Sequence, residues 1–233
     1  MALDTNLVSY YKLDSNSNDS VGTNNGTDTS VSYVSGKIGN AGSYNGSTSR
    51  TSLWNKVLSS WTTATISMWI NNSNAAQWQD VTILSNQYDT WNYWICLART
   101  TSGTSNDWNW FFWWGWGSYY WYGANTFSLP TSTWTHIAVT VNWATMKQYI
   151  NWAEYSSVTY WANINFTSAN NMFFWQSSYL YAWRYFNWLI DEVGIWSRAL
   201  SSTEITELYN AGAWITYPFT AGVLTAFFMF FMQ

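Results

Sequence analysis

The sequence predicts an all-β protein, built as a two-sheet antiparallel sandwich with one short α-helix near the C-terminus. Apolar and polar residues alternate with period two, as in TISMWI, where Ile66, Met68 and Ile70 share one face. Runs rich in Asn, Ser, Thr and Gly, such as NSNDSVGTNNGT and SGKIGNAGSYNGS, separate the strands. No period of about 20 to 50 residues repeats itself, which argues against propellers and solenoids. A chain of 233 residues fits one large all-β domain, which we place at residues 1–217.

A chain of hairpins is predicted in the middle of the sequence. In HIAVTV, Ile137, Val139 and Val141 line up on one face, and the following MKQYI reads as the return strand. YINWAEYSS then turns into a further strand. Consecutive strands therefore pair antiparallel.

Three Asn-Trp pairs stand where a tight turn is expected: Asn142-Trp143, Asn151-Trp152 and Asn187-Trp188. Asn-Gly is the common sequence of two-residue hairpin turns, because both central residues need a positive φ that Trp tolerates poorly. Three such residues would cost roughly 3–6 kcal/mol. Either these turns adopt other conformations, or tryptophan is not the encoded residue at these positions.

One helix is predicted over about residues 201–211, in RALSSTEITELYNAG. Ser201 and Glu204 have the spacing of a capping box, in which each side chain binds the other residue's backbone N–H. Ile205 and Leu208 lie on one side of the helix and predict an apolar edge packed against the sandwich. Gly212 is the expected stop.

The charge pattern argues against partners that attract basic surfaces. The net charge is −4, charged residues make up 9% of the chain, and the eight Lys and Arg residues are scattered. We therefore expect no binding to nucleic acid. The single Cys96 excludes an intramolecular disulfide.

The two ends of the chain carry different signals. MALDTNLVSYYKL lacks a basic segment followed by an apolar core, so we expect no signal peptide in this chain. Residues 218–233 form an apolar tail ending in AGVLTAFFMFFMQ. The tail is shorter than the roughly 20 residues of a membrane-spanning helix. It reads as a strand or a self-association segment, and no transmembrane span is expected.

Several segments together resemble the laminin G-like (concanavalin A-like) jelly-roll family. They are LVSYYKLDSNSNDSVGTNNGT, GKIGNAGSYNGS, ISMWI, WTHIAVTVN with MKQYINW, and FNWLIDEVGIWSRALSSTEITELYNAG, in this order over residues 7–212. LIDEVGIWSRALSSTEI is the most specific of them. The resemblance implies a two-sheet antiparallel jelly roll that acts as a non-catalytic recognition module on bacterial surfaces or in phage virions. The chain departs from the family pattern at residues 143, 152 and 188, where a small turn residue such as glycine is expected.

The sequence offers little for catalysis. Some jelly rolls of this kind hydrolyse glycans with two carboxylates, but the four glutamates form no such set: Glu154, Glu192, Glu204 and Glu207. Asp191 and Glu192 are adjacent, so on a strand they point to opposite faces and cannot act as a pair. His136 is the only histidine and reads as a packing residue on its strand. We expect no enzymatic activity.

A structural calcium ion is one interpretation of Asp191. In LIDEV this residue should share the face of Leu189, Val193 and Ile195, which look inward, and an unpaired carboxylate there is costly. In the family the first and last strands are near neighbours, so Asp19 with Asp191 and backbone carbonyls could hold Ca²⁺. The alternative is that Asp191 ties down the N-terminal turn through backbone N–H groups.

Ligand recognition would use aromatic faces that stack on sugar rings, with Asn and Gln amides binding hydroxyls. The candidates are Trp110, Trp114, Tyr119 and Tyr120, followed by Trp183 and Tyr185. The alternative for each of them is a place in the core.

We therefore expect a module that binds a surface glycan or similar polymer, displayed on a virion or a cell exterior. The alternative is a structural virion or filament subunit, in which aromatic surfaces and the apolar tail bind further copies or other subunits.

Overall fold

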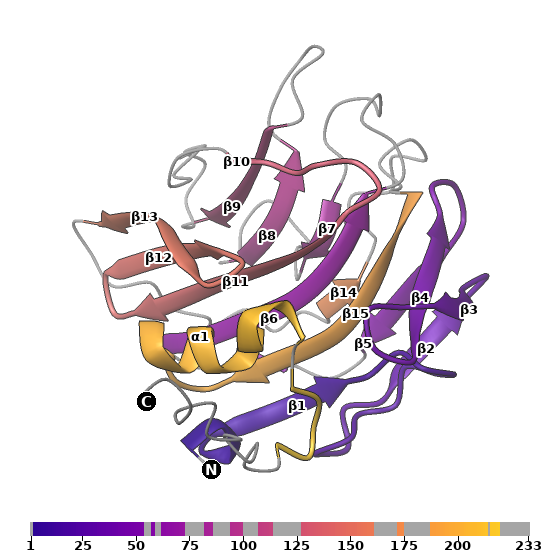
Figure 1. The fold of residues 1–233 in the computed structure, drawn as a ribbon, viewed down its shortest axis with the longest axis horizontal. Coiled ribbons are helices and arrows are strands. Elements are labelled where there is room, and N and C mark those ends of the chain that lie inside the picture. Colours follow the sequence, from indigo (N-terminus) through magenta and orange to yellow (C-terminus); the bar gives the residue numbers. More distant parts are fainter. Residues whose placement is uncertain are drawn as a thin grey trace, which may run out of the picture.

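Two antiparallel β-sheets lie face to face, and a helix covers the outer side of the first sheet (Figure 1). The computed structural model describes residues 2–53, 57–58, 62–72, 82–85, 94–99, 107–113, 127–160, 172–174, 187–213 and 215–219. In this part of the chain one α-helix is present, α1 (Ser202–Tyr209), with two short 3-10 turns at Ala2–Asp4 and Asn210–Gly212. The predicted all-β jelly-roll sandwich with one short helix is confirmed.

The strands divide into two sheets. Sheet A has the order β13-β12-β11-β6-β15-β4-β3, and β1 also pairs with β15. Its strands are β1 (Leu7–Tyr11), β3 (Ser32–Ser35), β4 (Asn40–Asn45), β6 (Thr63–Asn72), β11 (Trp134–Asn142), β12 (Thr145–Ile150), β13 (Ala153–Thr159) and β15 (Asn187–Trp196). Sheet B has the order β10-β9-β8-β7-β14-β5-β2. Its strands are β2 (Gly26–Thr29), β5 (Arg50–Leu53), β7 (Thr82–Ser85), β8 (Trp94–Arg99), β9 (Asp107–Trp113), β10 (Phe127–Ser128) and β14 (Met172–Phe174).

The core between the two sheets follows the alternation in the sequence. The residues predicted to share buried faces of β6 and β11 all lie in this core: Ile66, Met68, Ile70, Ile137, Val139 and Val141. Trp69, which alternates with them, belongs instead to a second cluster on the outer side of sheet A. The central strands β6, β11 and β15 of sheet A are therefore buried on both faces.

Helix α1 closes the outer cluster. Leu200, Ile205 and Leu208 are buried there beside Trp69, and Figure 1 shows α1 lying across β6. The predicted capping box is confirmed, because Ser201 and Glu204 bind each other's backbone N–H. The helix ends at Tyr209, earlier than predicted, because the next residue already has the left-handed conformation at φ 44°.

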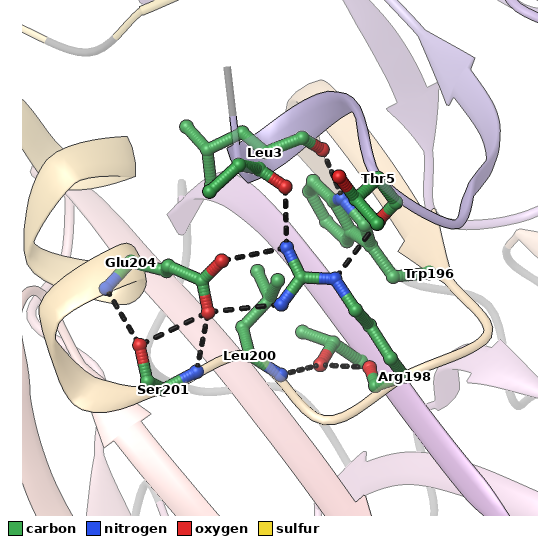
Figure 2. Close-up of polar contacts among 9 residues, drawn as sticks. Leu3, Thr5, Trp196, Arg198, Leu200, Ser201 and Glu204 are labelled. Atoms are coloured by element: carbon green, nitrogen blue, oxygen red, sulfur yellow. Dashed lines mark hydrogen bonds and ion pairs between the residues drawn. The ribbon is translucent and has the colours of Figure 1, made fainter.

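A polar clasp joins this helix to the N-terminus (Figure 2). The guanidinium of Arg198 donates to both carboxylate oxygens of Glu204, at 2.9 and 2.6 Å, and its Nε donates to the carbonyl of Thr5 at 2.9 Å. The indole of Trp196 donates to the carbonyl of Leu3 at 2.7 Å. Residues almost the whole chain apart thus hold one edge of the outer cluster together.

A bulge in β15 changes which of its residues face the core. The register with β6 shifts between Asp191 and Gly194, and Glu192 has a φ of 52°. Residues on both sides of the bulge lie in the core between the sheets: Trp188, Ile190, Val193 and Ile195. The prediction that Leu189 and Asp191 face this core is therefore wrong, because one extra residue reverses the alternation.

Only one of the three Asn-Trp pairs places its tryptophan in the left-handed region. Trp143 has a φ of 55° in the turn between β11 and β12. In the next turn Asn151 takes that conformation, at φ 58°, and Trp152 does not. Trp188 is a buried residue within β15, so the expectation of a turn there is wrong. With one tryptophan in the left-handed region, the expected backbone strain falls from roughly 3–6 to about 1–2 kcal/mol. This smaller strain is no longer an argument that another residue is encoded at these positions. That another residue is encoded there stays a hypothesis.

The apolar tail is described only at its start. Phe219 is buried in the outer cluster, where its ring stacks on Trp196 with centroids 6.3 Å apart. Residues 220–233 lie outside the described residues. Within those residues, no helix has the length and apolar character needed to cross a membrane.

Candidate functional site

The predicted aromatic site lies mostly outside the described residues. Trp110 is placed in β9, where its strand partner is Leu97. The other candidates are not described: Trp114, Tyr119, Tyr120, Trp183 and Tyr185. The prediction that these six residues bind ligand therefore stays a prediction.

Three aromatic side chains of the β11–β13 hairpins are exposed among the described residues. Trp143, Trp152 and Tyr155 have exposed fractions of 54%, 51% and 47%. Trp152 contacts Tyr209 of α1 at a centroid distance of 5.0 Å, and Tyr209 in turn stacks on the buried Trp69 at 5.7 Å. The indole of Trp152 is thus the outer member of a row of rings on the helix side of sheet A.

Tyr155 lies on the other side of the same hairpin. Its ring stands edge-on to Phe127 of β10, with centroids 6.1 Å apart and planes at 72°. Sequence reasoning did not single out Tyr155, and it treated Trp152 only as an anomaly of the turn. Both aromatic residues lie close together in the sequence of one hairpin, in NWAEY. This spacing is the sequence signal that could have identified them.

The two predicted calcium ligands have separate hydrogen-bond partners. Asp19 accepts from the backbone N–H groups of Tyr10 and Val21, both at 3.0 Å. Asp191 Oδ2 accepts from the N–H groups of Lys37 and Ile38 at 2.8 and 2.9 Å. The part of the chain that is described contains no group of three or more His, Cys, Asp or Glu residues arranged to hold a metal. These contacts match the alternative in which Asp191 fixes a turn, although that turn is the one between β3 and β4 and not the N-terminal one.

The β15 bulge brings Asp191 and Glu192 to the same side of sheet A. Asp191 is the register partner of Trp69, and Glu192 accepts hydrogen bonds from the hydroxyls of Tyr10 and Thr216, the latter at 3.1 Å. Trp69 and Tyr10 both belong to the outer cluster. The expectation that the two carboxylates project from opposite faces is therefore wrong, because the extra residue at the bulge turns them to one side.

Burial dominates the electrostatics of this pair. It raises the pKa of Asp191 to about 8, and the nearby Glu192 adds to the effect. Burial likewise raises the pKa of Glu192 to about 7, although the hydroxyls of Tyr10 and Thr216 oppose it. Both side chains are fully buried, so neither carboxyl reaches a substrate in solution.

His136 has the contacts of a buried structural residue. Its Nδ1 lies 2.7 Å from the carbonyl of Asn151, which can only accept, so Nδ1 carries the proton and Nε2 accepts from Ser67 Oγ at 2.7 Å. Burial lowers the pKa of His136 to about 4. A serine hydrogen-bonded to a histidine suits nucleophilic catalysis, but here both side chains are fully buried.

Comparison with known proteins identifies the family. A model of the concanavalin A-like lectin/glucanases superfamily matches residues 45–206. The chain belongs to this superfamily. No curated protein sequence matches it.

Solved structures with the same fold include several binding domains. Domain 4 of an extracellular arabinanase from Geobacillus stearothermophilus, in complex with arabinotriose, is 30% identical with a TM-score of 0.68, over 86% of this chain and 96% of that one. The binding domain of Paraclostridial Mosquitocidal Protein 1 is 20% identical with a TM-score of 0.69, over 90% of this chain and 53% of that one. The receptor binding domain of botulinum neurotoxin D is 17% identical with a TM-score of 0.64, over 90% of this chain and 54% of that one. Because the two toxin domains are only 20% and 17% identical to this chain, their similarity supports the fold alone.

Proposed function

We propose that this concanavalin A-like domain is a non-catalytic module that binds a surface glycan and is displayed on the exterior of a virion or a cell. The observation that carries the proposal is the 30% identity to an arabinanase domain solved with arabinotriose, over nearly the whole of that domain. Exposed aromatic rings on the β12–β13 hairpin add support, because aromatic faces stack on the apolar faces of sugars.

The experiment is a binding panel with the full chain. Arabinotriose is titrated by calorimetry, and linear arabinan, xylan, galactan, mixed-linkage β-glucan and polygalacturonate are cast into native gels for affinity electrophoresis. We expect at least one polysaccharide to slow the protein relative to serum albumin. If all six ligands leave the protein unaffected, the proposal is wrong.

The absence of catalysis belongs to the same proposal. Its support is that the candidate acid and base groups described, Asp191, Glu192 and His136, are fully buried and hydrogen-bonded within the fold. Incubation with each polysaccharide should release no reducing sugar. A release that disappears in Asp191→Asn would refute this part.

A structural subunit of a virion or filament is the competing proposal, supported by the apolar sequence AGVLTAFFMFFMQ. Deleting residues 220–233 separates the two, since this cut keeps Phe219, which is buried in the outer cluster. A binding module should still bind glycan after the deletion. A structural subunit should instead change from an oligomer to a monomer in light scattering, with no glycan bound by either form.

One structural calcium ion remains a proposal. Its support is that Asp191 Oδ1 is buried without a hydrogen-bond partner among the described residues. The described carboxylates do not form a calcium ligand set by themselves, so backbone carbonyls and water would have to supply most ligands.

A further inference from the structure

The turn between β12 and β13 presents an indole at the surface. Asn151 and Trp152 form this turn, between the paired residues Ile150 and Ala153. Asn151 takes the positive φ of the turn, 58°, and Trp152 does not have a positive φ. The large side chain therefore stands at the tip of a tight turn without the backbone strain of the left-handed region, with 51% of its surface exposed.

Hydrogen bonds to a buried histidine anchor this turn. The N–H of Asn151 donates to the carbonyl of His136 at 2.7 Å, and Nδ1 of His136 donates to the carbonyl of Asn151, also at 2.7 Å. The N–H of His136 donates in addition to Oδ1 of Asn151 at 3.3 Å. Because His136 is fully buried, the residue that precedes Trp152 is fixed to the interior of the protein.

Aromatic rings support the indole from behind. Trp152 contacts Tyr209, the last residue of α1, with ring planes at 41°. The ring of Tyr209 itself contacts two buried rings, those of Trp69 at 5.7 Å and His136 at 6.3 Å between centroids. A ring that is held by its backbone and by its neighbours loses little conformational entropy when a ligand covers its free surface.

The two outer rings also carry polar groups that the fold leaves unused. Among the described residues, neither the indole N–H of Trp152 nor the hydroxyl of Tyr209 has a hydrogen-bond partner. An indole N–H donates, and a phenol hydroxyl donates or accepts. A sugar ring offers the complement of such a surface, since its apolar C–H face can cover an aromatic ring while its hydroxyls bind polar groups at the rim.

We propose that Trp152 stacks on a sugar ring and forms a subsite of the glycan-binding function proposed above, on which this inference rests. Trp152 is not among the six aromatic residues predicted from the sequence. Tyr155 is not part of this subsite, because it is the extra residue of a bulge in β13 and its ring contacts Phe127 of sheet B.

The first test compares Trp152→Ala with the wild type on the panel of arabinotriose and five polysaccharides. For the ligand that the wild type binds most strongly, we expect the affinity to fall roughly tenfold, the loss expected for one aromatic contact. Trp143→Ala is the matched control. Trp143 is equally exposed in the turn at the other end of β12, but it makes no ring contact with a described residue. This variant should change the affinity less than about twofold.

Two further variants separate stacking from general apolar contact. Trp152→Phe keeps a flat ring at the turn and should bind within about threefold of the wild type. Trp152→Leu keeps an apolar side chain without a ring and should bind as weakly as Trp152→Ala. If Trp152→Leu binds as well as the wild type, stacking is wrong.

The second test does not depend on the alanine variant folding. In protein labelled with 5-fluorotryptophan, the ¹⁹F resonance of Trp152 is assigned by its absence in Trp152→Phe. This resonance should shift when the ligand that the wild type binds most strongly is added. An unshifted resonance overturns the inference.

The remaining outcomes separate the subsite from the proposed function. If the wild type binds glycan and Trp152→Ala binds equally well, the subsite is wrong while the proposed function stands. If Trp152→Ala converts an oligomer to a monomer in light scattering, a second copy of the chain covers the indole and the subsite is again wrong. If the wild type binds no ligand of the panel, the proposed function fails and the subsite fails with it.

Discussion

The strain at Trp143 can be isolated by four substitutions. Trp143 has a φ of 55° and Trp152 does not have a positive φ, although both are half exposed in adjacent turns of the same hairpin chain. Replacing each in turn by Ala and by Gly removes the indole in all four variants. Within each pair, the Ala and Gly variants differ only in the Cβ atom, so the lost indole contacts cancel.

Two terms then decide the order of stability. A Cβ in the left-handed region costs about 1–2 kcal/mol, and glycine costs roughly 0.5–1 kcal/mol through the entropy of the unfolded chain. At position 152 only the entropy applies, so Trp152→Ala should be the more stable of its pair. At position 143 the backbone strain of a Cβ atom offsets the entropic cost of glycine. The free energy of unfolding of Trp143→Gly should therefore equal or exceed that of Trp143→Ala. The Ala–Gly difference in stability at position 152 is subtracted from that at position 143, which cancels the entropic cost of glycine. The remainder, about 1–2 kcal/mol, is the strain of a Cβ atom in the left-handed region.

Urea unfolding followed by circular dichroism measures these differences. For a chain of this size, each kcal/mol corresponds to roughly 2–4 °C in the midpoint of thermal unfolding, so a thermal scan gives an independent check. If the Ala variant is the more stable by the same amount at both positions, the backbone at 143 is not left-handed and the reasoning fails. Peptide mass spectrometry across residues 108–188 of the purified protein also reads which residues occupy 143, 152 and 188.

Three further expectations concern charged groups. If a structural calcium ion binds Asp19 and Asp191, the midpoint of thermal unfolding should be higher in millimolar calcium than in EDTA, and an identical midpoint would exclude it. The raised pKa values of Asp191, about 8, and Glu192, about 7, mean that the folded chain holds these protons more tightly than the unfolded chain. Their stabilising contribution is complete below about pH 4 and is lost as the pH rises toward the folded values, so the free energy of unfolding in urea should fall from about pH 4 to about pH 8 and level off above that. Glu192→Gln should flatten this fall, and an unchanged slope would contradict the assignment. Glu204→Ala removes two charge-assisted hydrogen bonds to Arg198 and the capping box, and should lower the free energy of unfolding by about 1–3 kcal/mol, whereas a change below about 0.5 kcal/mol would show that the clasp is dispensable.

Features written in short stretches of sequence were predictable. The capping box of Ser201 and Glu204 depends on residues three apart, and the buried faces of β6 and β11 depend on alternation within one strand. Both features depend on residues close together in the sequence, so the tertiary packing of the chain did not alter them. The sandwich follows from them because such strands must bury their apolar faces against a second layer.

The bulges in β13 and β15 were not predictable from the same patterns. A bulge is a property of two paired strands, and the letters of one strand do not reveal which residue lacks a partner. In β15 the strict alternation therefore placed Leu189 on the wrong face. In β13 the alternation gave no sign that Tyr155, and not a neighbouring residue, would be the extra residue of the bulge. The candidate ligand-binding aromatics could be proposed from the sequence only by residue type, and all of them except Trp110 lie outside the described residues.

The β15 bulge also bears on how this fold uses its acidic residues. On a regular strand, one of the adjacent Asp191 and Glu192 would point into the apolar cluster between the sheets. With the extra residue, both turn to the outer side and find backbone amides and hydroxyls from the β3–β4 turn, from β1 and from Thr216. Those donors offset the cost of burial and fix segments from both ends of the chain onto sheet A. Carboxyls that are buried and hydrogen-bonded in this way are not free to attack a glycosidic bond, which agrees with the non-catalytic role proposed above.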